Sequence, residues 1–261
     1  MGPLFAWVSA IPGGSFLPLP PMVRATLTWV RNQLAEGRHT SSGRKPAEYG
    51  LLFKADAKAE EKRVVLGGYS CHQGEDLKLA AWYSLELTEA QAPWLFSKGH
   101  GSRTVAASEL LASLLCVVLL APPFPKEGRG MIRVTGVTDN QGNSYIIAKL
   151  LTTKYPLAPI LMELVKQLSS RGVWLHLQWA PREDNTIADD LTNSRFEQFS
   201  PERRVVTAWP AILESLLDLR RYLDLGAVFF REIEGIKEKR RLLPPTRAPS
   251  HKKARKILNP W

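Results

Sequence analysis

Ile132-Arg-Val-Thr-Gly-Val-Thr-Asp-Asn-Gln-Gly-Asn143 is the stretch that decides the fold, because a strand pattern meets a helix pattern within it. Its β-branched residues predict a buried strand over 132–138, which ends abruptly at Asp139. Polar residues and a glycine follow, and apolar helical spacing then predicts a helix over 143–151. Asp139 is therefore expected at the carboxyl end of a strand, where open α/β sheets bind ligands and metals.

The length and composition of the chain are those of a globular protein with a sizeable core. Its 261 residues are 44% hydrophobic and 23% charged, which is ordinary for a soluble domain. Cys71 and Cys116 lack the spacing of metal ligands and predict reduced thiols, hence an intracellular protein of the nucleus or cytoplasm. The apolar run Val105–Ala121 contains Glu109 and two serines, so it is too short and too polar for a membrane span.

Positive charge is concentrated at the C-terminus. Residues 237–261 contain nine Lys and Arg against one acid, a net +8 of the total +10, which leaves the body nearly neutral. The same segment is rich in proline and predicts disorder in the absence of nucleic acid. Two interpretations of this segment are open. It is either a solvated arm, or a segment that binds phosphate or serves as a nuclear signal. The candidate phosphate contacts are Lys252, Lys253, Arg255 and Lys256.

Predicted strands and helices alternate in the order β-β-β-α-β-α-α-β-α. Three apolar runs separated by turns predict an antiparallel meander, and the later strands are joined through helices, which favours parallel pairing. The fold class expected is α/β, with a five-stranded mixed sheet flanked by helices. The predicted strands are 51–55, 64–69, 79–87, 132–138 and 173–179; the predicted helices are 105–120, 143–151, 160–171 and one beginning near 185, capped by Asp184 or Asn185.

Composition divides the chain into four parts. They are an N-terminal extension (1–46), the sheet domain (47–198), a helical extension (199–236) and the basic tail (237–261). Residues 1–20, rich in proline and glycine, start without a clear element, and a helix follows over 22–34. An apolar stripe predicts one further helix, Trp209–Leu223, with Pro210 at its start and Gly226 past its end.

Four acids stand at element ends or in apolar surroundings: Asp56, Glu109, Asp139 and Asp189. Each of these acids, taken alone, has a simpler structural interpretation. Asp139 could cap a helix, Glu109 could face solvent, Asp56 could sit in a hairpin turn, and Asp189 could belong to an exposed pair. Their placement on successive elements instead predicts convergence at one edge of the sheet.

Converged carboxylates repel one another and raise one another's pKa unless cations neutralise them. An all-oxygen ligand set of this kind suits Mg²⁺, with Mn²⁺ as a substitute. Two such ions, about 3.5–4 Å apart, can activate a water and stabilise the leaving oxygen in phosphodiester cleavage. The sequence therefore predicts a two-metal hydrolase.

The order of these acids resembles that of ribonuclease H, and most closely the ribonuclease H domains of reverse transcriptases from DIRS-like and gypsy-like retrotransposons. The resemblance covers about residues 48–195, and four motifs in the right order make it fairly specific. The motifs are Lys54-Ala-Asp-Ala57, Ala107-Ser-Glu-Leu-Leu111, Val137-Thr-Asp-Asn-Gln141 and Asn185-Thr-Ile-Ala-Asp-Asp-Leu191.

The resemblance implies that the four acids bind two Mg²⁺ ions, with Asp56 bridging them, and that the substrate is the RNA strand of an RNA–DNA hybrid. Gln141 and its neighbour Asn140 fall where the family reaches the hybrid's minor groove, by shape and 2′-hydroxyl contact. Arg182, in the loop before the last predicted helix, is a further candidate contact to nucleic acid. A polymerase domain upstream in the same polyprotein is the implied protein partner, and residues 1–45 resemble the end of its thumb or connection region.

The chain departs from cellular ribonucleases H in two ways. The loop Ala180-Pro-Arg-Glu-Asp184 contains no histidine, and the basic helical protrusion is missing. His176 alternates away from the apolar positions of its strand and is expected to be an ordinary sheet residue. Two alternatives stay open: an inactive domain that binds nucleic acid as a scaffold, and a transposase- or integrase-type strand transferase. The second is disfavoured because Glu109 precedes Asp139.

Overall fold

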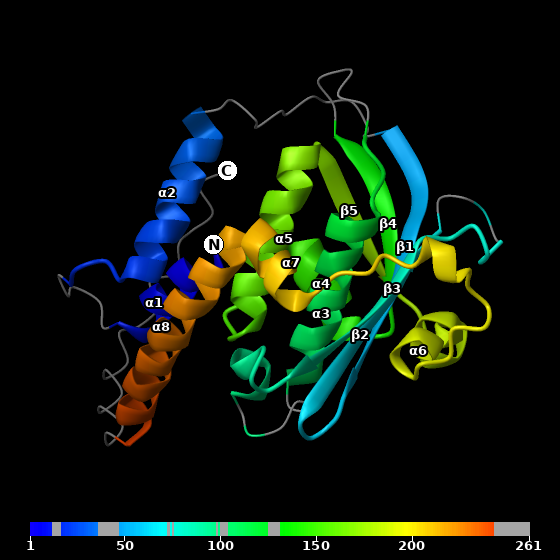
Figure 1. Cartoon of the computed structure of the whole chain (residues 1–261). Helices are drawn as coiled ribbons and strands as arrows, with labels where there is room; N and C mark the ends of the chain where they lie inside the picture. Colours follow the sequence, from blue (N-terminus) through cyan, green and yellow to red (C-terminus); the bar gives the residue numbers. More distant parts are fainter. Residues whose placement is uncertain are drawn as a thin grey trace, which may run out of the picture.

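The computed structural model of the chain is a mixed sheet with helices on both of its faces and a helical layer at one side (Figure 1). The structure describes residues 1–11, 17–35, 47–71, 74, 76–97, 99, 104–124 and 131–242. The end of the predicted N-terminal extension, residues 36–46, and the tail residues Lys252, Lys253, Arg255 and Lys256 lie outside these ranges. Among the described helices, none is long and apolar enough to cross a bilayer.

The five strands have the order β3-β2-β1-β4-β5. The first three pair antiparallel, whereas β4 pairs parallel with both β1 and β5. This topology confirms the predicted ribonuclease H-like fold. The strands are β1 (Ala47–Ala59), β2 (Arg63–Ser70), β3 (Trp82–Thr88), β4 (Ile132–Thr138) and β5 (Val173–Trp179).

The predicted helices of the sheet domain are present, with shifted ends. The Val105–Leu115 helix continues as a π-helical turn, Cys116–Leu120. Gly172 ends α5 with a left-handed φ of 67°, as a glycine after a helix commonly does. The helices are α1 (Gly2–Ala10), α2 (Pro21–Ala35), α3 (Val105–Leu115), α4 (Gln141–Lys149), α5 (Leu157–Arg171), α6 (Thr186–Thr192), α7 (Trp209–Ser215) and α8 (Leu217–Leu242), with short 3-10 turns η1 (Pro93–Phe96), η4 (Arg182–Asp184) and η5 (Pro201–Arg203).

Two adjacent glycines of β2 show that the helices cover opposite faces of the sheet. A Cβ added at Gly67 would lie 2.9 Å from Leu191 of α6, and one added at Gly68 would lie 2.4 Å from Cys116, at the end of α3. Successive residues of a strand point to opposite faces, so α6 packs on one face and α3 on the other. Both helices approach the sheet closely because β2 has no side chains at these two positions.

The N-terminal extension differs from its prediction, because residues 2–10 form a helix. The prediction of no clear element there was wrong: α1 is apolar all round, so its sequence lacks the periodic signal of a surface helix. It contacts α2 and α8, and the three helices share a small second core that includes Ala6, Met22 and Phe230.

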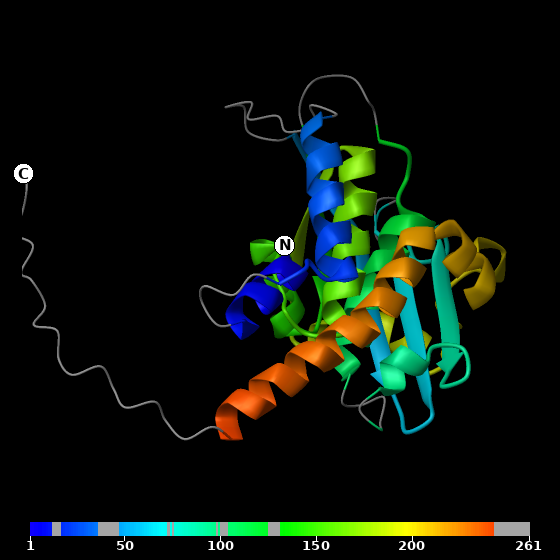
Figure 2. The same cartoon turned by 90° about the vertical axis from the view of Figure 1, so that its left-hand side faces the viewer.

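The C-terminal extension also differs. The single helix predicted at 209–223 is two, because the backbone at Leu216 leaves the helical region, and α8 then runs through Gly226 as far as Leu242. Gly226 lies inside α8, where a Cβ would come within 3.1 Å of Pro159, so it permits close packing on α5. The first basic residues of the predicted tail are therefore helical, and Figure 2 shows that end of α8 projecting beyond the core.

Candidate metal centre

The end of β4 opens one edge of β1 at the level of Asp56. Pairing between the two strands stops at Lys54 and Val137, whereas β1 continues, with Asp56 paired to Gly67 of β2. Asp56 thus lies within β1, not after it as predicted, and it is not a turn residue. Its side chain is almost fully buried, with 4% exposed. The missing strand leaves room beside it for groups from other elements.

Glu109 reaches this position from α3, and the alternative that it faces solvent is excluded, since only 3% of it is exposed. The Thr138 hydroxyl lies 3.4 Å from its Oε2, and the main-chain N–H of Ala57 donates to it. Burial, followed by the charges of Asp56 and Asp139, raises the pKa of Glu109 well above its ordinary value.

Asp139 follows β4 directly, and two hydrogen bonds from the end of β5 hold the main chain at residues 138 and 139. The Trp179 indole N–H donates to its carbonyl at 3.0 Å, and the Ala180 N–H donates to the carbonyl of Thr138. The alternative that Asp139 caps α4 is excluded, because Asn140 holds that position and accepts the Asn143 N–H at 3.1 Å. The carboxylate of Asp139 is therefore not used by the helix.

Asp56, Glu109 and Asp139 converge as predicted: one carboxylate oxygen from each lies within 4.8 Å of the others. None of the three has an ion-pair partner within the described part of the chain. Burial, then the charge of Asp139, raises the pKa of Asp56 from 3.8 to about 6. An all-oxygen set of acids without ion-pair partners fits a hard divalent cation, and the identity of that cation stays a prediction.

Asp189, the fourth predicted acid, lies on α6 at the opposite face of the sheet. Its charge is near enough to raise the pKa of Asp56, but its carboxylate is not among the three that converge. It is bound instead by Arg182, Asn193 and Arg195. The structure thus brings three of the four predicted acids together.

The predicted nucleic-acid contacts occupy different environments. Gln141 is exposed at the start of α4, two residues after Asp139. Asn140 is half-buried, and its side-chain oxygen is engaged in the cap of α4. Arg182 is 70% exposed and lies on η4, next to the acids. His176 is exposed on the sheet, as expected.

Two buried asparagines, whose long-range contacts the sequence did not predict, brace the helices of the site. Asn185, one of the two residues expected to cap α6, holds the N-cap position but makes no side-chain cap; its amide donates to the Ala55 carbonyl of β1 at 3.0 Å. The Asn143 amide donates to the Ala106 carbonyl of α3 at 2.8 Å. The chain gives no local signal for these contacts, because each joins segments far apart in sequence.

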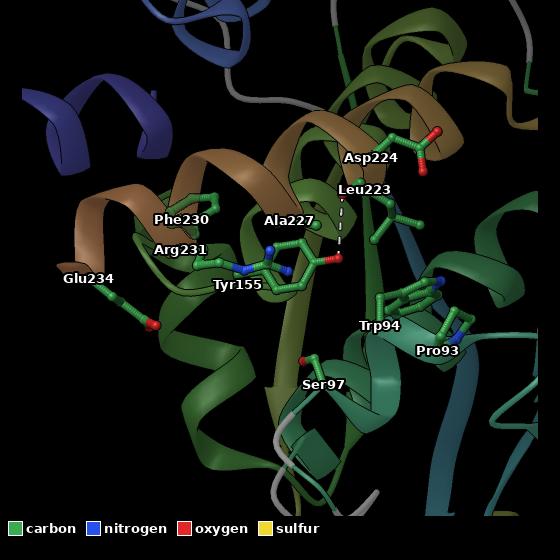
Figure 3. A pocket seen from close by; sticks show the side chains of 10 residues that line it. All are labelled: Pro93, Trp94, Ser97, Tyr155, Leu223, Asp224, Ala227, Phe230, Arg231 and Glu234. Carbon is green, nitrogen blue, oxygen red and sulfur yellow. Dashed lines mark hydrogen bonds between the residues drawn. The ribbon is translucent and has the colours of Figure 1, made fainter.

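A separate cavity of about 390 Å³ lies between α8, η1 and the turn before α5 (Figure 3). Tyr155 and Trp94 line it, and the Tyr155 hydroxyl lies 3.4 Å from the Leu223 carbonyl, which accepts its hydrogen bond. None of the acids of the cluster borders this cavity. The candidate metal centre is thus at the opened sheet edge, away from this pocket.

Fold and site together define a ribonuclease H-like domain with a buried acidic cluster that could hold a metal ion. No model of a known protein family matches the chain. A comparison with curated proteins likewise finds no significant match.

Proposed function

We propose that the protein is a metal-dependent nuclease that hydrolyses the RNA strand of RNA–DNA hybrids, as the ribonuclease H domain of a retroelement reverse transcriptase. The observation that carries this proposal is the convergence of Asp56, Glu109 and Asp139 at the edge where β4 ends. The motif order of the ribonuclease H family supports the choice of substrate.

Mg²⁺ held by these carboxylates would supply an activated water and charge stabilisation at the leaving oxygen. The chain's own contribution is to hold the ligands in place. Glu109 is fixed by burial in α3, and Asp139 by the indole N–H of Trp179 on its carbonyl. Such preorganised carboxylates need little rearrangement when a cation binds.

For substrate recognition, Gln141 is the better placed of the two neighbouring polar residues. It is exposed beside Asp139, whereas the carboxamide oxygen of Asn140 accepts a main-chain hydrogen bond as the N-cap of α4. Gln141 would thus read the minor groove by its shape and its 2′-hydroxyls, without sequence preference. An attached polymerase domain would add affinity for the same hybrid.

The clustering of three acids, of which Asp56 and Glu109 are buried, argues against the inactive scaffold. Carboxylates that are kept together and largely buried, without an ion-pair partner, reduce stability. An inactive scaffold has no use for acids that lower its stability, whereas a metal-dependent hydrolase needs clustered carboxylates to bind its cation. Nothing in the described residues favours the strand transferase, in which the glutamate follows the second aspartate.

The direct test is cleavage of a labelled RNA–DNA hybrid by purified protein, with Mg²⁺ or with EDTA. The expected result is hydrolysis of the RNA strand with Mg²⁺ alone, and no cleavage of single-stranded RNA or duplex DNA. Hydrolysis that persists in EDTA, or no hydrolysis at any protein concentration, would contradict the proposal. Joining of DNA ends would point to the strand transferase instead.

A further inference from the structure

Asp189 is held in a cage of hydrogen-bond donors. Arg182 donates to its Oδ1, while the Asn193 amide and Arg195 donate to its Oδ2 at 2.7 and 3.3 Å. Only 17% of the Asp189 side chain is exposed. Both of its oxygens are therefore occupied by groups of the chain itself, and two of those groups carry a positive charge.

These two arginines oppose a role of Asp189 as a metal ligand. A second divalent cation held by Asp56 and Asp189 would lie close to both guanidinium groups, whose positive charges would repel it. The repulsion persists at any working pH, because arginine side chains stay protonated. Asp189 can join the other acids only when the arginines turn away from it.

The arginines themselves are free to change partner. Arg182 is 70% and Arg195 55% exposed, and ion pairs this open to water are weak. Asp189 is the only carboxylate paired with Arg182 in the described structure, whereas Arg195 also holds Asp190 at 2.6 Å and so stays attached to α6. Arg182 is thus the more easily displaced of the two.

A phosphate of the nucleic-acid backbone is the group best suited to take the place of Asp189 as the partner of the two arginines. A guanidinium group binds phosphate oxygens in the same bidentate way in which it binds a carboxylate. A phosphodiester of the substrate brings its negative charge into the site when the substrate binds. Arg182 also lies within electrostatic reach of Asp56 and Asp139, so a phosphate bound to it would be next to the acidic cluster.

We propose that Arg182 and Arg195 are exchangeable counter-ions of Asp189: they hold its carboxylate in the free protein and pass to a backbone phosphate of the nucleic acid, which releases Asp189 toward the other acids. This inference rests on the proposed nuclease function. The free protein then binds one divalent ion at Asp56, Glu109 and Asp139, and a second ion becomes bound only together with the nucleic acid.

The first test counts Mn²⁺ ions on the full chain by calorimetry, without nucleic acid. The wild type is expected to bind one ion. The double variant, which combines Arg182→Gln with Arg195→Gln, should also bind a second ion, with an affinity at that second site at least about tenfold higher than in the wild type. Arg133→Gln is the matched control, since it also removes an arginine from an ion pair, that with Glu48, at the far end of the sheet. It should bind one ion, like the wild type.

The second test measures binding of the hybrid in EDTA, where cleavage cannot interfere. Arg182→Gln should weaken binding about tenfold and reduce the slope of log affinity against log salt by about one, as expected for one lost phosphate contact. The effect of Arg195→Gln should be smaller, and Arg133→Gln should have none. Circular dichroism checks that each variant folds.

Two results would overturn the inference without touching the ribonuclease assay. One is two tightly bound Mn²⁺ ions on the wild type in the absence of nucleic acid. The other is a double variant that still binds one ion and keeps wild-type affinity for the hybrid. Because neither measurement depends on hydrolysis, loss of the proposed function would be recognised separately, by the Mg²⁺-dependent cleavage assay.

Discussion

The hydroxyl of Thr192 on α6 lies 2.9 Å from the carboxylate of Asp56 on β1, although 136 residues separate them in the sequence. The same hydroxyl lies 2.9 Å from the main-chain carbonyl of Asp189, one helical turn earlier. Its hydrogen bond lowers the pKa of Asp56, against the effects of burial and of the neighbouring acids. Thr192 thus links the helix that carries the fourth acid to the centre of the cluster.

Replacement of Thr192 by valine should therefore raise the pKa of Asp56 further. The ionised form loses a hydrogen bond, so hydrolysis should reach half its maximum about one pH unit higher than in the wild type. The pH profile of hybrid cleavage measures this shift. Thr192→Ser keeps the hydroxyl and is the control; an unshifted profile for the valine variant would show that the hydroxyl does not govern ionisation of Asp56.

The metal-free protein should become more stable as the pH falls from 7 to 5. The pKa of Asp56 in the fold is about 6, above its ordinary 3.8, so the folded state takes up a proton before the unfolded state does. The gain from Asp56 alone is on the order of 1 kcal/mol over this window, and Glu109, raised in the same direction, adds to it.

Urea unfolding in EDTA at pH 5, 6 and 7 tests this prediction. Saturating Mg²⁺ should remove or reverse the trend, because protons compete with the metal for the same oxygens. In Asp56→Asn the contribution of this residue should disappear. Stability in EDTA that decreases steadily toward pH 5 would mean that the acids are already neutralised by some other group.

Much of the fold was accessible from sequence because the strands carry their own signals. The alternation in Val173–Trp179 and the β-branched run before Asp139 predicted strands whose ends match the structure. The element order then allowed few topologies. Helix ends were less predictable where packing determines them. The sequence predicted that Gly226 ends a helix, whereas in the structure it lies inside α8 and permits close packing on α5.

The candidate site was predicted in part for a similar reason. Asp56, Glu109 and Asp139 stood out because each is a charge in an apolar setting. The contacts of Arg195, Asn193 and Thr192 were not foreseen, since polar residues are ordinary at the end of a helix and just after it. Thr192 lies three residues after Asp189, on the same helical face, and this spacing was the one available signal.

Asp139→Asn should abolish hydrolysis of the hybrid while leaving the fold intact. The amide removes a charge from the candidate metal ligands, whereas the hydrogen bond from Trp179 is accepted by the main-chain carbonyl of residue 139 and is kept. Cleavage at saturating Mg²⁺, together with thermal unfolding, measures both effects. Asp218→Asn, which breaks the ion pair between Asp218 on α8 and Lys166 on α5, is the control and should remain active; wild-type turnover in the Asp139 variant would remove this residue from the mechanism.

Gly136, inside the strand that decides the fold, should not tolerate a side chain. It pairs with Phe53 of β1, and an added Cβ would lie 2.3 Å from the Phe53 ring, which is fully buried. Gly136→Ala should therefore lower the free energy of unfolding by about 1–3 kcal/mol.

Chemical denaturation measures this loss, and two variants show its cause. Gly235→Ala, on the exposed side of α8 with nothing within 4 Å of its Cβ position, should instead stabilise the protein by up to about 1 kcal/mol. Adding Phe53→Leu to Gly136→Ala should restore part of the lost stability, because the smaller side chain makes room for the methyl group. If the double variant is as unstable as the sum of the two single changes, the ring is not what excludes a side chain at position 136.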